Sequence, residues 1–501
     1  MSVIKRRHFL RSTLAVAPAA LLPYGRLFAA AEGAAMNDVE AVTGAGTQII
    51  LKAADVKDFA ARLRGDLLLR DSAGYDVARR VWNGAFDRHP ALIARCTGAA
   101  DVVQAVKFAA ANQLLVSVRG GGHSLSGQSV CEKGLMIDLS QMNGVHVDPV
   151  KRVATVEGGA LLGALDREAL ALGLATTAGT VSHTGVGGLT LGGGFGRLCR
   201  RFGLACDNVR GIDLVTAGGK FLNASSQQIP ELFWGLRGGG GNFGVATSFE
   251  FQLHPVDPVM LGGDLMFSWE DAPAVLKFFF DFAREAPDEL NADVAAVRLP
   301  NNQRFVSFEI CYSGDRAQGE KVLAPLRQIR KPIVDQIVPT PYVTLQSSSD
   351  VATEHGHRYY IKGGFVQKVT PGYIDTMIGI IQDANLAQVQ AVSMPQGGGA
   401  IARIKPHATA FAQRAADHNA FIFTRWDDPA QNEAVAGWIK SAWAKLEPHT
   451  HGFYVNEFNT EDAARLGTTY GDNFARLAAL KAKYDPDNLF RLNANIAPKK
   501  A

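Results

Sequence analysis

Apolar residues follow helical and strand periods in turn along much of the chain. Residues 100–113 place Val102 and Val106 on one face at helical spacing, which predicts an amphipathic helix. A second helix is expected over residues 161–173. Short strands are expected at residues 114–119, 134–140 and 152–159. Because these strands are short and several are joined by tight glycine turns, the pattern predicts a two-part α+β domain rather than a doubly wound sheet.

The segments on either side of this domain have different patterns. Residues 54–85 are expected to be helical with a linker. Further along, residues 304–314 and 421–429 alternate between apolar and polar positions as strands do, and residues 272–286 have a helical period. The second half of the chain is therefore expected to have its own strands and helices.

Composition excludes several classes of protein. The chain has 501 residues, which favours more than one core. Hydrophobic residues make up 47% and charged residues 20%, as in a packed globular protein. The formal charge of +3 is too small to indicate a nucleic-acid partner. The five cysteines are odd in number and lack C-x-x-C spacing, so we expect small buried thiols and neither a disulfide framework nor a metal site.

The first residues have the pattern of an export signal. Arg6 and Arg7 precede an apolar stretch, and three alanines end at Ala31. This resembles a twin-arginine signal peptide over residues 1–31. The alternative, a short basic membrane anchor, is disfavoured because prolines interrupt the stretch, which is too short to span a bilayer. We expect a periplasmic or secreted protein that uses the twin-arginine export machinery and has no membrane span in its mature chain.

Glycine is concentrated in three loops, at residues 117–127, 178–198 and 237–244. The third loop contains a G-x-G-x-x-G run, but a helical segment precedes it and a strand-like segment follows it. That order is the reverse of the dinucleotide-binding fingerprint. Backbone N–H groups in glycine turns can still hold phosphates without a helix. Three such loops indicate a large ligand with two phosphates and a flat ring system.

The ordered set of loops resembles the PCMH-type FAD-binding domain of the vanillyl-alcohol-oxidase superfamily. Residues 453–496 resemble the berberine-bridge-enzyme-like branch of that superfamily. The resemblance implies a two-subdomain FAD-binding domain plus a substrate domain with an antiparallel sheet backed by helices. The expected boundaries are 1–31 for the signal, 32–88 for a helical and linker segment, 89–256 for the FAD-binding domain, 257–449 for the substrate domain, and 450–501 for a segment that returns to the FAD-binding domain.

The resemblance also implies which residues hold the cofactor. His123 stands where the family bonds a histidine to the 8α carbon of the flavin, although without the resemblance a turn histidine bonded to backbone is the simpler interpretation. Val181 stands where many members have a second, cysteine tether, so a single link is expected. His183 and Thr184 could face the flavin or only pack. The other implied cofactor-binding residues are Arg119, Gly120, Gly121, Gly122, Ser124, Gly127, Gly185, Gly187, Gly188, Gly192, Gly193, Gly194, Gly196, Asn242, Gly244, Val245, Asn456, Asn493 and Asn495.

The candidate catalytic residues lie near the C-terminus. A base must take the proton from the substrate's heteroatom when a hydride leaves its carbon. Glu457 stands where carbohydrate-oxidising relatives have a tyrosine, and burial could raise its pKa enough for this role. A surface or ion-pairing role for Glu457 is equally open, and Tyr454 is a second candidate. Relatives also have an acid in the region corresponding to residues 400–414, where this chain has none.

Three functions remain open at this stage. The first is an exported FAD-linked oxidase or dehydrogenase of a sugar, alcohol or small secondary metabolite. The second is an oxidase of an amine or alkaloid-like substrate. The third is a flavin-carrying protein without turnover, which the long substrate domain disfavours. Oxygen or another compound would accept the electrons.

Overall fold

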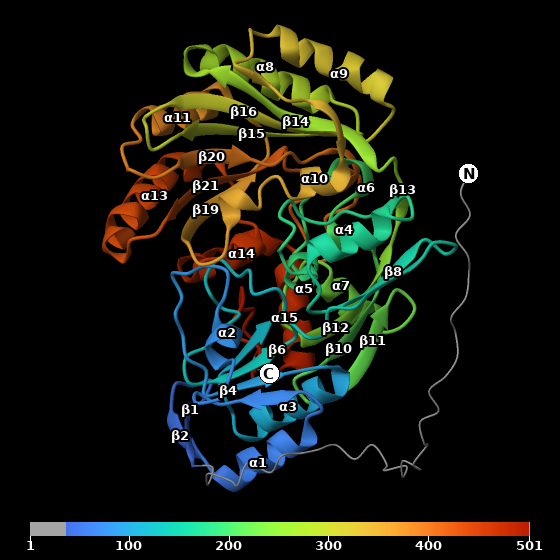
Figure 1. Ribbon diagram of the computed structural model, residues 1–501, viewed down its shortest axis with the longest axis vertical. Coiled ribbons are helices and arrows are strands. Elements are labelled where there is room, and N and C mark those ends of the chain that lie inside the picture. The colour runs from blue at the N-terminus through green and yellow to red at the C-terminus, as the bar shows by residue number, and fades with distance from the viewer. Residues whose placement is uncertain (1–36, 500–501) are drawn as a thin grey trace, which may run out of the picture. The chain divides into compact units, whose positions relative to one another are not determined.

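The computed structural model describes residues 37–499. The predicted export signal, with Arg6 and Arg7, lies outside these residues. The described chain contains two sheets that build the FAD-binding part expected from the sequence and a larger sheet that builds the substrate part (Figure 1). The mixed helix and sheet architecture confirms the predicted α+β class.

The first part of the described chain builds a four-stranded sheet with helices beside it (Figure 1). The elements are β1 (Val39–Val42), β2 (Gln48–Leu51), α1 (Ala53–Arg62), β3 (Asp66–Leu68), α2 (Tyr75–Arg79), β4 (Leu92–Arg95), α3 (Ala99–Ala111), β5 (Val116–Arg119) and β6 (Leu135–Asp138). The sheet order is β3–β4–β6–β5, with the last three strands parallel. The hairpin of β1 and β2 and strand β3 correct the prediction that residues 32–88 form only helix and linker. Their runs of three or four residues are too short to show a strand period.

A second, antiparallel sheet follows with the order β11–β10–β12–β8–β7. Its elements and those beside it are β7 (Val145–Asp148), β8 (Val153–Glu157), α4 (Leu162–Leu170), β9 (Leu174–Ala175), α5 (Val186–Leu191), α6 (Cys199–Phe202), β10 (Val209–Val215), β11 (Phe221–Ser225), α7 (Pro230–Leu236), β12 (Val245–Gln252) and β13 (His254–Pro255). Helix α7 precedes the third glycine loop and strand β12 follows it. This confirms the reversed order that excludes a dinucleotide-binding fingerprint.

The expected substrate domain contains an eight-stranded antiparallel sheet with helices on one face, which we call the substrate sheet (Figure 1). Its strands are β14 (Val259–Ser268), β15 (Leu290–Arg298), β16 (Arg304–Tyr312), β17 (Val334–Asp335), β18 (Val338–Pro341), β19 (Arg358–Val366), β20 (Gln390–Met394) and β21 (His418–Trp426). Its helices are α8 (Ala272–Glu285), α9 (Arg316–Gln328), α10 (Tyr342–Gln346), α11 (Pro371–Gln382), α12 (Gly399–Arg403) and α13 (Asn432–Leu446). Alternate strand residues such as Val294, Phe308 and Ile422 pack against α8, α9, α11 and α13 in one core. The residues between them face the other way.

The C-terminal segment packs against the first two sheets. It contains the short helical turns η6 (Val455–Glu457) and η7 (Thr460–Arg465), then α14 (Leu466–Tyr470) and α15 (Asn473–Tyr484). Leu477 and Leu480 of α15 and Ile496 join the core of the five-stranded sheet. Helix α15 ends directly before the turn at Asp485.

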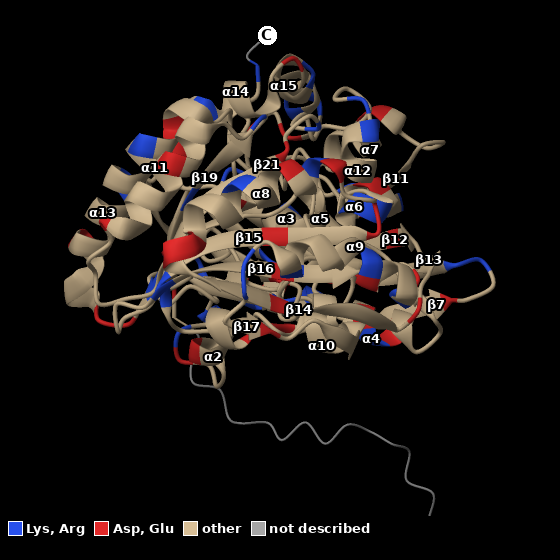
Figure 2. Ribbon diagram, turned by 90° about the horizontal axis from the view of Figure 1, so that it is seen from above, with Lys and Arg blue, Asp and Glu red and all other residues tan. Residues whose placement is uncertain are grey.

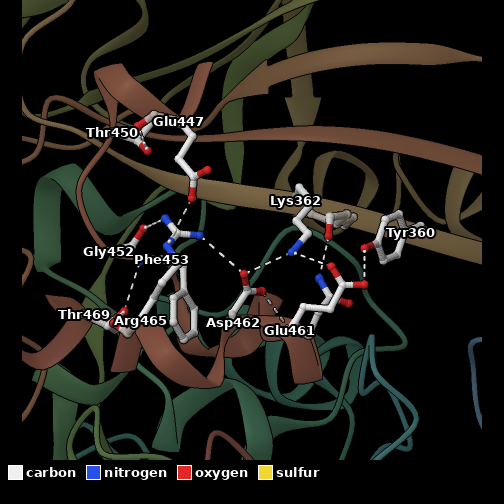
Figure 3. A network of polar contacts seen from close by, with 12 residues as sticks. Tyr360, Lys362, Glu447, Thr450, Gly452, Phe453, Glu461, Asp462, Arg465 and Thr469 are labelled. Carbon is white, nitrogen blue, oxygen red and sulfur yellow. Dashed lines mark hydrogen bonds and ion pairs between the residues drawn. The ribbon is translucent and has the colours of Figure 1, made fainter. Parts of the chain in front are cut away.

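A network of ion pairs joins this segment to the substrate sheet (Figure 3). Lys362 Nζ on β19 lies 3.1 Å from Asp462 Oδ1 and 3.3 Å from Glu461 Oε2. Arg465 lies 3.4 Å from Asp462 and 3.5 Å from Glu447, which follows α13. The side chains of Lys362 and Asp462 are less than a tenth exposed. The network therefore fixes η7, and with it the neighbouring turn η6, against β19.

The surface and the cysteines agree with the composition. Lysine, arginine and acidic residues are interspersed over the helices and strands seen in Figure 2. All five cysteines are free and buried, and burial raises the pKa of each thiol. This confirms the expectation of small buried thiols. Within residues 37–499, no helix combines the length and apolar character needed to cross a bilayer.

Candidate functional site

The three glycine loops, the substrate sheet and the C-terminal segment enclose one large cavity. Its volume is about 770 Å³, within the range of roughly 300–1,000 Å³ that is usual for ligand sites. The face of the substrate sheet that the helices leave free forms one wall, with residues from β14, β15, β16, β20 and β21. The loops and the segments around Asn456 and Asn493 form the opposite lining.

Glycine is required where the first two loops meet. A Cβ on Gly121 would lie 2.4 Å from the Gly185 nitrogen, and a Cβ on Gly185 would lie 2.3 Å from the Gly121 nitrogen. The two backbones therefore touch directly. At the third loop, Gly244 has φ of +155° and a Cβ there would lie 2.4 Å from the Val215 oxygen. Only glycine avoids a steric clash at these positions, and the loops hold their N–H groups beside the cavity as a result.

The structure brings most of the predicted site residues to the cavity. Those that line it are Gly120, Gly121, Gly122, His123, Ser124, Gly185, Gly187, Gly188, Gly196, Gly244, Val245, Tyr454, Asn456, Glu457 and Asn493, together with Val181 and Thr184. Those outside its lining are Arg119, Gly127, Gly192, Gly193, Gly194, Asn242 and Asn495.

The residues outside the lining support it instead. Arg119 donates to the Ala78 carbonyl oxygen and lies 3.9 Å from Asp138. Asn242 donates to the Gly239 and Ala494 carbonyl oxygens, and its own Oδ1 accepts from the Ile496 nitrogen. It therefore ties the third glycine loop to the C-terminal segment.

His123 lies in a stack of aromatic rings. Trp82 stacks on its imidazole with ring centroids 4.2 Å apart, and Tyr359 stacks on the other face of Trp82 at 3.9 Å. Nε2 of His123 lies 3.2 Å from Nδ1 of His183. Burial, together with the nearby imidazoles of His183 and His355, lowers the pKa of His123 to about 3. The imidazole is therefore neutral near pH 7 and keeps a lone pair on one ring nitrogen.

Glu457 is held at the cavity by one amide. Its Oε1 accepts a hydrogen bond of 2.8 Å from Nδ2 of Asn419 on β21, and its Oε2 has no donor among the described residues. Burial raises the pKa of Glu457 to about 8, and the charge of Asp462 acts in the same direction. The carboxyl group therefore changes its protonation state near physiological pH, which suits a general base.

Tyr454 is fixed within the second glycine loop. Its hydroxyl oxygen accepts hydrogen bonds from the Gly194 nitrogen at 2.8 Å and from Asn456 Nδ2 at 2.7 Å. Burial raises the pKa of Tyr454 well above its usual value of 10. A phenolate is therefore strongly disfavoured here, and the geometry supports a positioning role for Tyr454 and Asn456.

Several residues at the cavity were missed by the sequence reasoning. Trp82 lies in the segment that was expected to be a linker, where no period marked it. Asn419, Asp264, Asp293 and Glu309 face the cavity from the substrate sheet. Their alternation with apolar residues was visible, but a strand pattern does not distinguish a face toward solvent from a face toward a cavity.

The cavity suits a dinucleotide with a flat ring. No lysine or arginine is among the residues that line it in the described chain, so the donors available to a pyrophosphate are backbone N–H groups of the glycine loops and neutral side chains such as Ser126 and Gln128. The buried Oδ1 of Asn493 has no donor, and can accept a hydrogen bond from a ligand. The loops, this amide and the ring stack beside His123 are compatible with FAD.

Comparisons with known proteins agree with this description. Residues 90–225 match the family model described as an FAD binding domain, and residues 453–497 match the model described as berberine and berberine like. An FAD-linked oxidoreductase of Dictyostelium discoideum is 33% identical over 88% of this chain and 97% of its own length. (R)-6-hydroxynicotine oxidase of Paenarthrobacter nicotinovorans is 31% identical over 87% of this chain and 97% of its own. The solved structure of a chitooligosaccharide oxidase has a TM-score of 0.80 at 26% identity, and the match covers 89% of this chain and all of that one.

Proposed function

The chain belongs to the berberine-bridge-enzyme-like FAD-linked oxidoreductases, and we propose that it oxidises a small molecule at a carbon that bears oxygen or nitrogen. FAD, when bound, accepts the hydride from that carbon. Glu457 is the main support for the proposal, because the residue lines the cavity, its Oε2 has no hydrogen-bond donor within the described chain, and its pKa of about 8 lets it take a proton at physiological pH. Named relatives act on 6-hydroxynicotine and on chitooligosaccharides, so the family alone does not decide between an amine and a sugar.

The residues around the cavity have different roles in the proposed reaction. Asn419 orients Glu457 so that Oε2 remains free to accept the proton of the substrate's hydroxyl or amino group. Tyr454 and Asn456 hold the second glycine loop beside the cavity. The aromatic and apolar residues of the lining keep water away from the reacting atoms.

His123 is proposed to carry the single covalent link to the cofactor. A neutral imidazole is a competent nucleophile, and its low pKa keeps it neutral. The new bond joins a ring nitrogen to the flavin's 8α carbon. One N–H bond of the imidazole and one C–H bond of the flavin's 8-methyl group are lost. The two electrons and two protons pass to the same electron acceptor that reoxidises the flavin during turnover. Val181 lines the cavity where relatives place a second tether, and valine forms no such bond.

We propose that the protein is exported after folding, because residues 1–31 have the pattern of a twin-arginine signal. The periplasm or the exterior is then its place of action, with oxygen or another compound as the electron acceptor. The twin-arginine export machinery is the partner that this route requires.

An anaerobic substrate screen tests the proposed reaction. The flavin absorbance band is followed while alcohols, sugars and amines are added one at a time. A substrate should bleach the band, and air or another acceptor should restore it. If no member of any of these classes bleaches the flavin, the protein carries flavin without turnover and the proposal is wrong.

A further inference from the structure

Three carboxyl groups form a row across the wall of the cavity that the substrate sheet provides. Asp264 on β14 is the cross-strand neighbour of Glu309 on β16, and Glu309 is in turn the neighbour of Asp293 on β15. All three line the cavity. We call Asp264, Glu309 and Asp293 the acidic row.

The acidic row places three carboxyl groups beside one arginine. Arg197 pairs with Glu309 at 2.5 Å and is the cation at this wall. Burial and the charge of Glu309 raise the pKa of Asp293 to about 7 and also raise the pKa of Asp264. Four carboxyl groups line the cavity: the three of the acidic row and Glu457. Among the described residues that line it, there is no lysine or arginine. Like charges at this spacing destabilise one another unless a cation lies between them.

Several carboxylate and amide oxygens along this wall have no donor in the described part of the chain. Asp293 Oδ1 accepts from the Gln396 nitrogen and from Asn291, which leaves Oδ2 free. The Asp264 side chain has no hydrogen-bond donor among the described residues. Further along the sheet, Asn419 is 1% exposed and its Oδ1 also has no donor. A ligand that satisfies these oxygens must donate hydrogen bonds.

We infer that the acidic row binds a protonated amine of the substrate, at a distance from the carbon that is oxidised. This inference rests on the proposed function and narrows its substrate class. An ammonium group supplies three donors and one positive charge, which matches the free oxygens of Asp264, Glu309 and Asp293. A neutral sugar supplies hydroxyl donors but leaves the excess negative charge uncompensated.

The sheet geometry sets the distance between the two ends of the substrate. Asp293 is held by Gln396, which follows β20, and Asn419 of β21 donates its backbone N–H to the Pro395 oxygen. Two strand spacings therefore separate Asp293 from Asn419, or about 10 Å at about 4.8 Å for each step. Asn419 in turn holds Glu457. The substrate is thus an elongated molecule with a cationic end and an oxidisable end. The described residues contain no group of side chains arranged to hold a metal ion, so an organic cation is the ligand that the row fits.

Thermal denaturation of the FAD-loaded enzyme tests the site without turnover. The probes are 6-aminohexan-1-ol and its neutral isostere hexane-1,6-diol, because only the first has an ammonium group. The melting temperature should rise with the aminoalcohol at concentrations where the diol has no effect. The double variant Asp264→Asn/Asp293→Asn should weaken this binding at least about 10-fold, since it removes two charges that face the ammonium group.

The control variant is Asp213→Asn/Glu250→Gln, which changes the net charge equally on the exposed part of the five-stranded sheet. It should retain the full thermal shift. Asp264→Asn alone serves if the double variant does not fold, because the Asp264 carboxyl has no internal hydrogen bond to lose. Equal shifts by the diol and the aminoalcohol, or an unchanged shift in the acidic-row variants, would overturn the inference.

Flavin bleaching under nitrogen, read in parallel, separates this inference from the proposed function. Binding of the aminoalcohol that depends on the acidic row supports the site even if this probe is not oxidised. Bleaching by sugars or by the diol with no preference for the ammonium group supports the oxidase and overturns the amine site.

Discussion

Glu457 and Tyr454 both face the cavity, but burial gives them different chemistry. Both groups are acids whose charged form burial disfavours. The pKa of Glu457 rises to about 8, so about a tenth of the molecules are ionised at pH 7. The pKa of Tyr454 also rises, from a higher starting value, and its oxygen already accepts two hydrogen bonds. At the scale of single residues, this difference supports the proposal that Glu457 is the base and Tyr454 a positioning residue.

Glu457→Gln should remove the base and keep the shape of the site. The rate of flavin reduction by a substrate should fall by about 10²–10⁴, with an unchanged FAD content. In the wild-type protein the rate should rise with pH up to about 8, because only the ionised carboxylate accepts a proton and its folded-state pKa lies there. Stopped-flow measurements at several pH values check both points, and the variant should lack this rise.

The matched control is Glu461→Gln, four residues away in the ion-pair network and outside the cavity lining. Its rate and pH profile should stay near those of the wild-type protein. If Glu457→Gln instead stays within about threefold of the wild type with the rise intact, another residue is the base. Loss of FAD would show that Glu457 is structural.

His123→Ala should release the cofactor on denaturation. Wild-type protein denatured in acid should keep a fluorescent flavin on the gel band, and the variant should show none, because Val181 offers no second tether. Some FAD should stay bound to the folded variant through the glycine loops. His146→Ala on the exposed strand β7 should retain the fluorescent band. Complete release of flavin from the denatured wild-type protein would contradict the covalent link to His123. Flavin that stays attached to the denatured variant would reveal a second covalent link.

At the scale of elements, helices and strands with a regular apolar period could be predicted from the sequence. The strand faces that line the cavity could not. The helix at α3, the strands β5, β6 and β8 and the reversed order around the third glycine loop were all predictable from apolar periods. Strands β1 to β3 were not, since three or four residues do not establish a period. His123 and Glu457 were found through motifs. Trp82 and the acidic row were not, because cross-strand neighbours such as Asp264 and Glu309 are far apart in the chain.

Lys362→Met should weaken the attachment of the C-terminal segment. Asp462 would lose its closest cation while buried (Figure 3), and removal of one partner from a buried pair costs about 3–5 kcal/mol. The melting temperature of the FAD-loaded enzyme should drop by several degrees. The less compensated charge of Asp462 should also raise the pKa of Glu457 further, so the pH at which flavin reduction reaches its maximum should move upward.

Lys440→Met is the control, because Lys440 pairs with Glu461 at 2.9 Å while about half exposed. An exposed pair contributes at most about 1 kcal/mol, so this variant should melt close to the wild type with an unchanged pH profile. Equal effects of the two lysine substitutions would show that the network does not position Glu457.

At the scale of the whole molecule, the cavity is assembled from distant parts of the chain. Its lining includes residues from Trp82 to Ala494 and draws on all three large sheets. The cofactor can therefore be enclosed only when the full chain has folded. For the proposed export, this assembly favours passage across the membrane in the folded state with FAD bound. The twin-arginine route is the one that carries folded proteins.

Replacing Arg6 and Arg7 together by lysine should block that route. A folded precursor with bound flavin should accumulate in the cytoplasm, and little or no mature protein should reach the periplasm or the medium. Cell fractionation with antibody detection and in-gel flavin fluorescence measures both pools. Arg11→Lys, which changes an arginine outside the pair, should leave export intact. Normal export of the paired variant, or delivery of the wild type as an unfolded chain through the general secretion route, would contradict the assignment. In the second case FAD would have to be acquired outside the cytoplasm, which the enclosure of the cavity by the whole chain makes unfavourable.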